Sequence, residues 1–229
     1  MIVRYVFFPG WAVAPEYYRC LNFLDGEWPE VTDYGFFTAA ATFEPRHIPA
    51  CADAAEPVVI LAHSMGTMFA LRAAATRTHI KALVLFSPFA RFSEAEGYGG
   101  QPLRILKAMR MQLRRDPKAL LENFYSAMSN PEVIGFEPGA SINVAALDNG
   151  LECLMEYDVR ELLPEIKCPV LLIQGGMDNI SAHGQAAYLA ERLPSGHRKT
   201  ITDAGPALPF TRMDECRNTV QSFLRQYIG

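Results

Sequence analysis

Ser64 lies at a junction that favours nucleophilic chemistry, because an apolar run over residues 58–62 ends just before it and an alanine-rich run begins just behind it. Ala62 and Gly66 stand at the positions of the small residues in the spacing Gly-x-Ser-x-Gly, which is typical of a tight turn from a strand into a helix. Such a turn places the hydroxyl above the sheet, and the first amides of the helix face whatever the hydroxyl attacks. The pattern predicts a serine nucleophile rather than a small residue that merely ends a buried strand.

Acyl transfer by a serine also needs a base that takes its proton, a carboxylate that orients the base, and donors for the oxyanion. Asp178 follows a predicted strand over residues 170–176, which fits the chain order serine, acid, histidine. A turn-forming or helix-capping aspartate is the alternative. The oxyanion donors should be the backbone N–H groups of Met65, behind Ser64, and of Trp11, because the strand before Trp11 is expected to neighbour the strand before Ser64.

Apolar runs alternate with helical patterns along the chain, which predicts an α/β fold with a mostly parallel sheet covered by helices on both faces. The predicted strands are rich in β-branched, aliphatic and aromatic residues, and most are bounded by Pro, Gly or Ser. We expect strands over residues 2–8, 31–36, 58–62, 81–87, 170–176 and 198–201, and helices over residues 16–23, 65–76 and 213–227.

Between residues 87 and 169 the rhythm changes to three long helical patterns, at 102–114, 117–128 and 145–157. A connection of this length is not a simple loop. We interpret it as a helical cap over the carboxyl ends of the strands, where open α/β sheets bind their ligands. The chain is predicted to form one domain, residues 1–229, with a cap insertion at about 90–165.

Composition narrows the classes of function that the chain can have. Half of the 229 residues are apolar, which is enough for one sizeable core, and the net charge of −4 gives no general reason to expect nucleic acid or an anionic membrane as a partner. The five cysteines have no metal-site spacing, and their odd number argues against a disulfide framework. This cysteine usage predicts a protein of the reducing cytoplasm, and we expect neither a metal nor a cofactor. No signal peptide or membrane span is expected either.

Several motifs distributed over nearly the whole chain carry a family resemblance. They are Pro9-Gly10-Trp11, His63-Ser64-Met65-Gly66, Asn149-Gly150-Leu151-Glu152 leading into Tyr157-Asp158-Val159-Arg160, Gly176-Met177-Asp178, and Ala204-Gly205 followed by Ala207-Leu208-Pro209-Phe210. With these motifs the chain resembles the α/β-hydrolases, and among them the pimeloyl-[acyl-carrier protein] methyl ester esterases of biotin synthesis. A related family of biotin-pathway hydrolases with a similar Gly-Trp start is the alternative match. The resemblance implies a serine carboxylesterase that acts on a carrier-bound methyl ester.

Pro206 departs from this family, whose members carry the catalytic histidine in a run such as Ala-Gly-His-Ala-x-x-Pro-Phe. Proline has no ionisable group and no amide hydrogen, so it cannot serve as the base. His183, five residues past Asp178, is the best substitute; His63 directly precedes the serine, and the other histidines are expected far from it. Two hypotheses follow: an esterase that works through a Ser64 acyl-enzyme, or a hydrolase-like protein with a decayed triad that acts as a binding or carrier-interacting module.

The predicted cap is locally basic, and Arg110, Arg114 and Arg115 are the residues through which it could attract a partner. From composition alone, an ordinary solvated helix face is the simpler interpretation. The resemblance implies an acidic acyl-carrier protein, which a basic cap would steer towards the cleft. Apolar cap residues could line an acyl pocket or simply pack as helix faces: Leu106, Met109, Met111, Leu120, Leu121, Phe124 and Met128.

Overall fold

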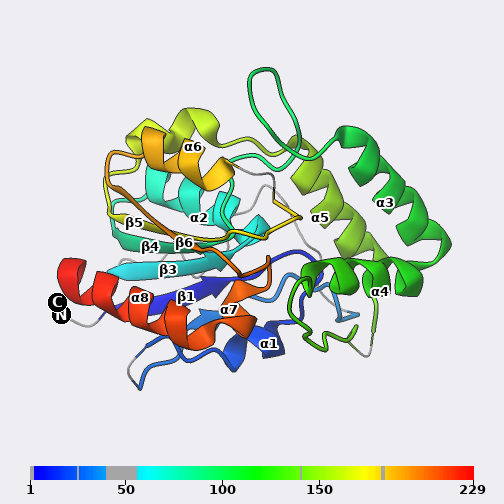
Figure 1. The fold of residues 1–229 in the computed structure, drawn as a ribbon, viewed down its shortest axis with the longest axis horizontal. Helices are drawn as coiled ribbons and strands as arrows, with labels where there is room; N and C mark the ends of the chain where they lie inside the picture. The colour runs from blue at the N-terminus through cyan, green and yellow to red at the C-terminus, as the bar shows by residue number, and fades with distance from the viewer. Residues whose placement is uncertain (1–2, 25, 40–55, 140, 182–183) are drawn as a thin grey trace.

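A parallel sheet forms the centre of the fold in the computed structural model, which describes residues 3–24, 26–39, 56–139, 141–181 and 184–229. Within these residues six strands pair in the order β2-β1-β3-β4-β5-β6 (Figure 1). β1 pairs with β3, so the strand before Trp11 neighbours the strand before Ser64, as predicted. The strands are β1 (Arg4–Phe8), β2 (Glu30–Val31), β3 (Val58–His63), β4 (Ile80–Phe86), β5 (Val170–Gly175) and β6 (Gly196–Ile201).

Helices cover both faces of the sheet, which confirms the predicted α/β class with its covered parallel sheet (Figure 1). α2 and α6 lie on one face, and α1 and α8 lie on the other. Every residue of β3 is buried, as expected for a central parallel strand with helices on both sides. The helices of these two layers are α1 (Pro15–Arg19), α2 (Met65–Thr76), α6 (Gln185–Arg192) and α8 (Met213–Tyr227); the short α7 (Leu208–Thr211) precedes α8.

Two predicted elements are shorter than expected, and a local turn explains the first of them. The strand predicted over 31–36 ends after Val31, because the Asp33 carboxylate accepts the Gly35 N–H at 2.7 Å and Gly35 has a positive φ of 73°. The helix predicted over 16–23 ends at Arg19. The apolar residues beyond it are buried in the core from a non-helical segment. The apolar pattern of the sequence therefore predicted a strand and a helix that are both too long.

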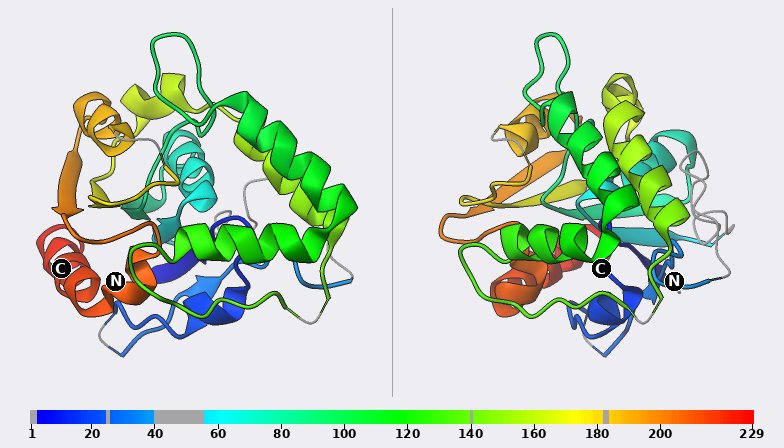
Figure 2. Two further views of the ribbon diagram at one scale, coloured as in Figure 1. Left: turned by 45° about the vertical axis from the view of Figure 1, so that its right-hand side comes forward. Right: turned by 90° about the vertical axis from the view of Figure 1, so that its right-hand side faces the viewer.

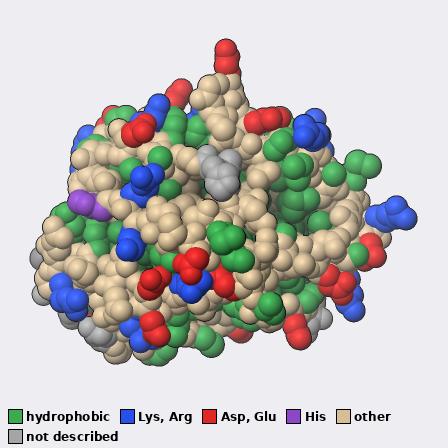
Figure 3. All heavy atoms as spheres, viewed as in Figure 1, with side chains coloured by type: hydrophobic (Ala, Val, Ile, Leu, Met, Phe, Trp, Pro, Cys, Tyr) green, Lys and Arg blue, Asp and Glu red, His purple; other side chains and the backbone are tan. Residues whose placement is uncertain are grey.

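Three helices inserted between β4 and β5 lie beyond the carboxyl ends of the strands (Figure 2). They are α3 (Leu103–Arg115), α4 (Pro117–Met128) and α5 (Val144–Glu156), each within one or two residues of its predicted range. Apolar side chains gather over this part of the molecule (Figure 3), and Ile105 and Met111 of α3 are exposed. In the described part of the chain, no helix has the length and apolar character needed to span a membrane. The division into domain and cap remains a prediction.

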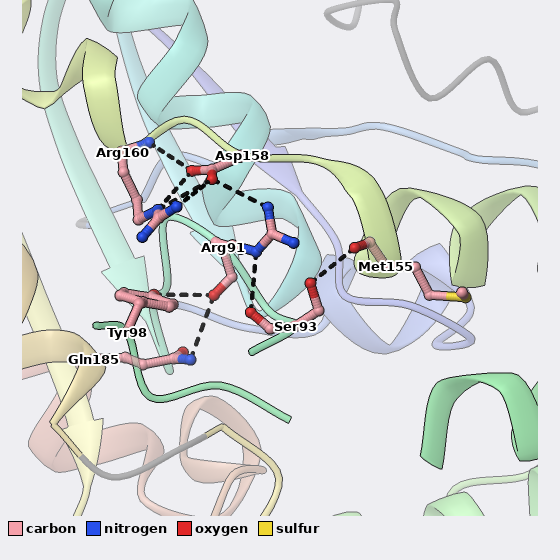
Figure 4. Close-up of polar contacts among 7 residues, drawn as sticks. All are labelled: Arg91, Ser93, Tyr98, Met155, Asp158, Arg160 and Gln185. Atoms are coloured by element: carbon pink, nitrogen blue, oxygen red, sulfur yellow. Dashed lines mark hydrogen bonds and ion pairs between the residues drawn. The ribbon is translucent and has the colours of Figure 1, made fainter. Parts of the chain in front are cut away.

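A cluster of polar side chains joins the segment that enters the insertion to the segment that leaves it (Figure 4). The Arg91 guanidinium donates to the Asp158 carboxylate at 3.1 Å, and Arg160 binds the same carboxylate at 2.7 Å. The Ser93 hydroxyl donates to the Met155 carbonyl at 2.7 Å. These bonds join the segment that leaves β4 to the end of α5. The Asp-Val-Arg motif noted in the sequence therefore has a structural role where the insertion returns to the sheet. Its last residue begins the 3₁₀ helix η2 (Arg160–Glu165).

Candidate active site

Ser64 occupies a strained turn between β3 and α2, with φ 52° and ψ −121°. A positive φ is uncommon for a residue other than glycine and is retained where surrounding contacts fix it. Here the Ser64 N–H donates to the Phe86 carbonyl at 3.0 Å, and the Thr67 hydroxyl donates to the Ser64 carbonyl at 2.6 Å. Within the described residues no hydrogen bond engages the Ser64 hydroxyl, so it is available to a ligand.

Two backbone N–H groups beside Ser64 have the setting of an oxyanion hole. Met65 begins α2, and the first N–H groups of a helix have no acceptor within it. In the described part of the chain, the Trp11 N–H donates to no other group. The segment that carries it is held by the Tyr125 hydroxyl, which donates to the Ala12 carbonyl at 2.7 Å. The structure thus places both predicted donors at the carboxyl end of the sheet; their role in catalysis remains a prediction.

The Trp11 side chain connects this segment to the insertion. Its indole N–H donates to the Leu147 carbonyl of α5 at 3.0 Å, and its ring meets Phe124 of α4 edge-on at 4.9 Å. A Cβ added at Gly150 would lie 2.5 Å from the Trp11 ring. The glycine of the Asn-Gly-Leu-Glu motif is therefore required by the approach of Trp11. This requirement was not foreseen from the sequence, because it depends on a contact between distant segments.

Asp178 follows β5 and is buried, and its carboxylate accepts four hydrogen bonds from neighbouring residues. Oδ1 accepts the N–H groups of Ile180 and Ser181, both at 2.9 Å. Oδ2 accepts the Ser181 hydroxyl at 2.6 Å and the Gln174 amide at 2.9 Å. A carboxylate offers about four lone-pair sites, so these four bonds fill them. Asp178 thus follows β5 with its lone-pair sites occupied by these neighbours, and its role as the catalytic acid remains a prediction.

Pro206, which takes the position of the catalytic histidine in the resemblance, borders the same small cavity as the serine and the acid. Together with Ser64, Ser87, Asp178 and Ser181 it lines a small cavity of about 10 Å³. A cavity of this size is close to the space that one water molecule needs. The proline side chain contributes no proton acceptor there.

The described histidines do not fill the role of base. Burial lowers the pKa of His63 to about 4, and both of its ring nitrogens are engaged, with the Tyr18 hydroxyl and with the Pro206 carbonyl. His79 precedes β4 and His197 is the second residue of β6, so both lie at the amino ends of strands, away from Ser64. His47 and His183 lie outside the described residues.

An apolar cavity of about 350 Å³ opens onto Ser64 from the insertion. No charged side chain is among the described residues that line it. Of the residues considered from sequence, Leu121 packs in the core, Met128 lines the small cavity, and Met111 is exposed. The lining consists of Trp11, Ser64, Phe92, Ile105, Leu106, Met109, Leu120, Phe124, Ala127, Leu154 and Ile180, with the uncharged polar residues Gln101, Gln112, Asn123 and Asn179.

Two of the three arginines predicted to meet a partner are engaged within the insertion. Arg110 binds Asp148 through two bonds of 2.7 Å, and Arg114 binds the same carboxylate at 3.2 Å. The hydrogen bonds from Arg110 and then Arg114 lower the pKa of Asp148. Arg115 is exposed and, among the described residues, forms no ion pair. Of these three arginines, Arg115 alone is without an ion-pair partner in the described part of the chain.

Comparison with known proteins places the chain in a family. The model described as serine aminopeptidase, S33, matches residues 40–205. A pimeloyl-[acyl-carrier protein] methyl ester esterase of Neisseria meningitidis serogroup C is 30% identical over 203 residues, covering 82% of this chain and 79% of that protein. One of Xanthomonas oryzae pv. oryzae is 27% identical over 191 residues, covering 79% and 76%. The resemblance noted in the sequence is thereby confirmed.

Solved structures support the same fold. An esterase from Exiguobacterium antarcticum has a TM-score of 0.81 at 17% identity, covering 97% of this chain and 92% of that one. MenH from S. aureus has a TM-score of 0.78 at 17% identity, covering 99% and 95%. These matches and the parallel sheet show the α/β-hydrolase fold, and the family model that matches residues 40–205 shows that the chain belongs to the serine aminopeptidase S33 family.

Proposed function

We propose that the protein is a serine esterase that hydrolyses the methyl ester of a pimeloyl group carried by an acyl-carrier protein, as a step of biotin synthesis in the cytoplasm. The observation that carries the proposal is the uncharged apolar cavity of about 350 Å³ that reaches Ser64. The names of the relatives from Neisseria and Xanthomonas support this substrate.

In the proposed reaction the Ser64 oxygen attacks the ester carbonyl, methanol leaves, and water then hydrolyses the acyl-enzyme. The N–H groups of Trp11 and Met65 would stabilise the oxyanion, because neither donates elsewhere in the described part of the chain. His183 is the proposed acceptor of the serine proton. Without any base, binding and the oxyanion hole alone support acceleration on the order of 10³ over water.

The absence of charge from the described lining of the cavity favours an ester over a free acid. An uncharged methyl ester and its methylene chain lose little on entering apolar surroundings, whereas an unpaired carboxylate is strongly disfavoured there. The same difference favours release of the product, since hydrolysis converts the buried ester into a carboxylate. A neutral acyl ester is therefore the ligand that suits this cavity best.

Labelling by an alkyl fluorophosphonate tests the proposal, because the reagent reports an activated serine. We expect the wild-type chain to be labelled, Ser64→Ala to abolish labelling, and His183→Ala to lower its rate. Ser126→Ala is the matched control, since Ser126 is an exposed serine of α4 outside the apolar cavity. Labelling that persists in Ser64→Ala would contradict the assignment of the nucleophile.

A decayed triad is the second candidate, and the saturated carboxylate of Asp178 beside Pro206 favours it. In that case the protein binds the carrier-linked ester without turning it over. Absence of wild-type labelling, together with retained binding of the ester, would select this candidate over the esterase.

The exposed stripe of α3 is the surface proposed to meet the carrier protein. Arg104, Lys107, Met111 and Arg115 follow one another at intervals of three and four residues, so they share one face of the helix, and all four are exposed. Among the described residues, none of the three cationic side chains forms an ion pair. An acidic partner with an apolar contact of its own would suit this stripe.

Charge reversal of the stripe should separate carrier-bound from free substrates. For the triple variant Arg104→Glu, Lys107→Glu, Arg115→Glu we expect kcat/KM on the carrier-bound ester to fall about tenfold or more, because electrostatic steering is lost. Hydrolysis of a small methyl ester should not change. The control is Arg198→Glu with Lys199→Glu on the exposed edge strand β6. Equal activity of the triple variant and this control on the carrier-bound ester would refute the docking surface.

A further inference from the structure

A buried chain of hydrogen bonds joins three segments around Ser64. The Gly10 N–H donates to the Tyr18 hydroxyl at 2.9 Å, and this hydroxyl lies 2.8 Å from Nδ1 of His63. Nε2 of His63 lies 3.0 Å from the Pro206 carbonyl oxygen. Tyr18 and His63 are 0% and 1% exposed, so water does not compete for these bonds.

The donors and acceptors in this series of hydrogen bonds can be assigned in only one way. A carbonyl oxygen accepts but cannot donate, so Nε2 of His63 must carry the hydrogen that binds Pro206. Nδ1 is then an acceptor, and the Tyr18 hydroxyl donates to it while accepting the Gly10 N–H. Burial, which lowers the pKa of His63 to about 4, keeps the ring neutral and the tautomer fixed.

The three anchored segments are those that form the site. Gly10 precedes Trp11, His63 precedes Ser64, and Pro206 stands at the position of the base. The packing is close, because a Cβ added at Gly10 would lie 3.2 Å from Nδ1 of His63 and 3.3 Å from the Ser64 Cβ. Breaking any one of these hydrogen bonds would therefore change the distance between the Trp11 N–H and Ser64.

We propose that Tyr18 and His63 are positioning residues of the oxyanion hole, holding the Trp11 N–H in register with Ser64. This inference rests on the proposed attack by Ser64. The chain ends on the main-chain carbonyl of residue 206, which also accepts the Ser87 hydroxyl at 3.3 Å. Because no bond involves the side chain of residue 206, proline leaves the arrangement intact.

Tyr18→Phe is the main test, and Tyr17→Phe is its matched control. The Tyr17 hydroxyl accepts the Glu137 N–H at 2.9 Å and has no part in the chain. We expect Tyr18→Phe to lower the labelling rate and the kcat for a small methyl ester by about tenfold to a hundredfold, since misplacement by 1 Å can cost 10²-fold. The KM should not change, because the apolar cavity does not include Tyr18.

Variants of His63 guard against a purely structural loss. The side-chain amide of His63→Gln can accept from Tyr18 and donate to Pro206, so it should retain kcat within a few fold. His63→Leu can do neither and should resemble Tyr18→Phe. An unchanged kcat in Tyr18→Phe, or an equal loss in Tyr17→Phe, would overturn the inference.

Parallel measurements in the Pro206→His background separate this inference from the proposed function. If neither parent is labelled, the proposed function fails, and amide hydrogen exchange decides the positioning role. Faster exchange at Trp11, beyond the Gly10 N–H that loses its own acceptor, in Tyr18→Phe but not in Tyr17→Phe would then support it. Unchanged exchange in both variants would refute it.

Discussion

In a His183→Ala background, which removes the proposed substitute base, replacing Pro206 by histidine is expected to raise the rate of ester hydrolysis by about 10² to 10⁴, the usual contribution of a general base. The side chain of residue 206 already borders the small cavity between Ser64 and Asp178. The Ser64 hydroxyl has no competing bond among the described residues, so it is free to donate to an imidazole. The activity should also acquire an ionisation near pH 6.5, the ordinary pKa of histidine. Steady-state kinetics on a small methyl ester between pH 5 and 9 would measure both effects.

The main chain at residue 206 should tolerate this change, because His63 and Ser87 hold its carbonyl and not its side chain. The obstacle is Asp178, whose Oδ2 is filled by Ser181 and Gln174. Adding Ser181→Ala to Pro206→His frees one acceptor site and should raise the rate further. Ser181→Ala alone should have no such effect.

Pro206→Ala is the matched control, since it removes the ring without supplying a base. An equal gain in Pro206→Ala would show that relief of the proline constraint, and not proton transfer, is responsible. A folded Pro206→His variant that gains nothing even with Ser181→Ala would exclude a latent triad at this position.

The sequence predicted those features of the site that depend on local order along the chain. The turn at Ser64 and the acid after β5 could be placed because each follows an apolar strand directly, and parallel strands end at one edge of the sheet. The saturation of Asp178 could not be foreseen, because Gln174 contributes to it from a strand position whose side-chain direction is not encoded by apolar periodicity alone. The pairing of Arg110 with Asp148 was missed for a related reason, since the two residues lie 38 positions apart on different helices.

The chain through Tyr18 and His63 shows the same limit more clearly. His63 was recognised as part of the motif His63-Ser64-Met65-Gly66, but its two partners come from α1 and from the segment after β6. A tyrosine in a short helix gives no sequence signal for such a contact. Buried polar groups find partners across the whole fold, so their bonds emerge only when the elements are packed.

Gly66→Ala is expected to destabilise the fold strongly, because the added methyl group would meet main-chain atoms. A Cβ at this position would lie 2.2 Å from the Phe8 carbonyl oxygen and 2.6 Å from the Pro9 carbonyl oxygen. No rotamer change can relieve a clash with backbone, so α2 and the end of β1 must move apart. Overpacking of this kind costs roughly 1–3 kcal/mol or more in the free energy of unfolding. Gly135→Ala is the control, since a Cβ there meets nothing within 4 Å.

The same substitution should impair catalysis beyond its effect on stability. β1 leads to Trp11 and α2 begins at Met65, so separating the two elements separates the two oxyanion donors. Loss of one well-placed donor costs about 10² to 10³ in kcat. Urea unfolding and fluorophosphonate labelling of the folded fraction would measure the two effects independently. A Gly66→Ala variant with the unfolding midpoint and labelling rate of Gly135→Ala would refute the close approach of α2 and β1 as the basis of the site.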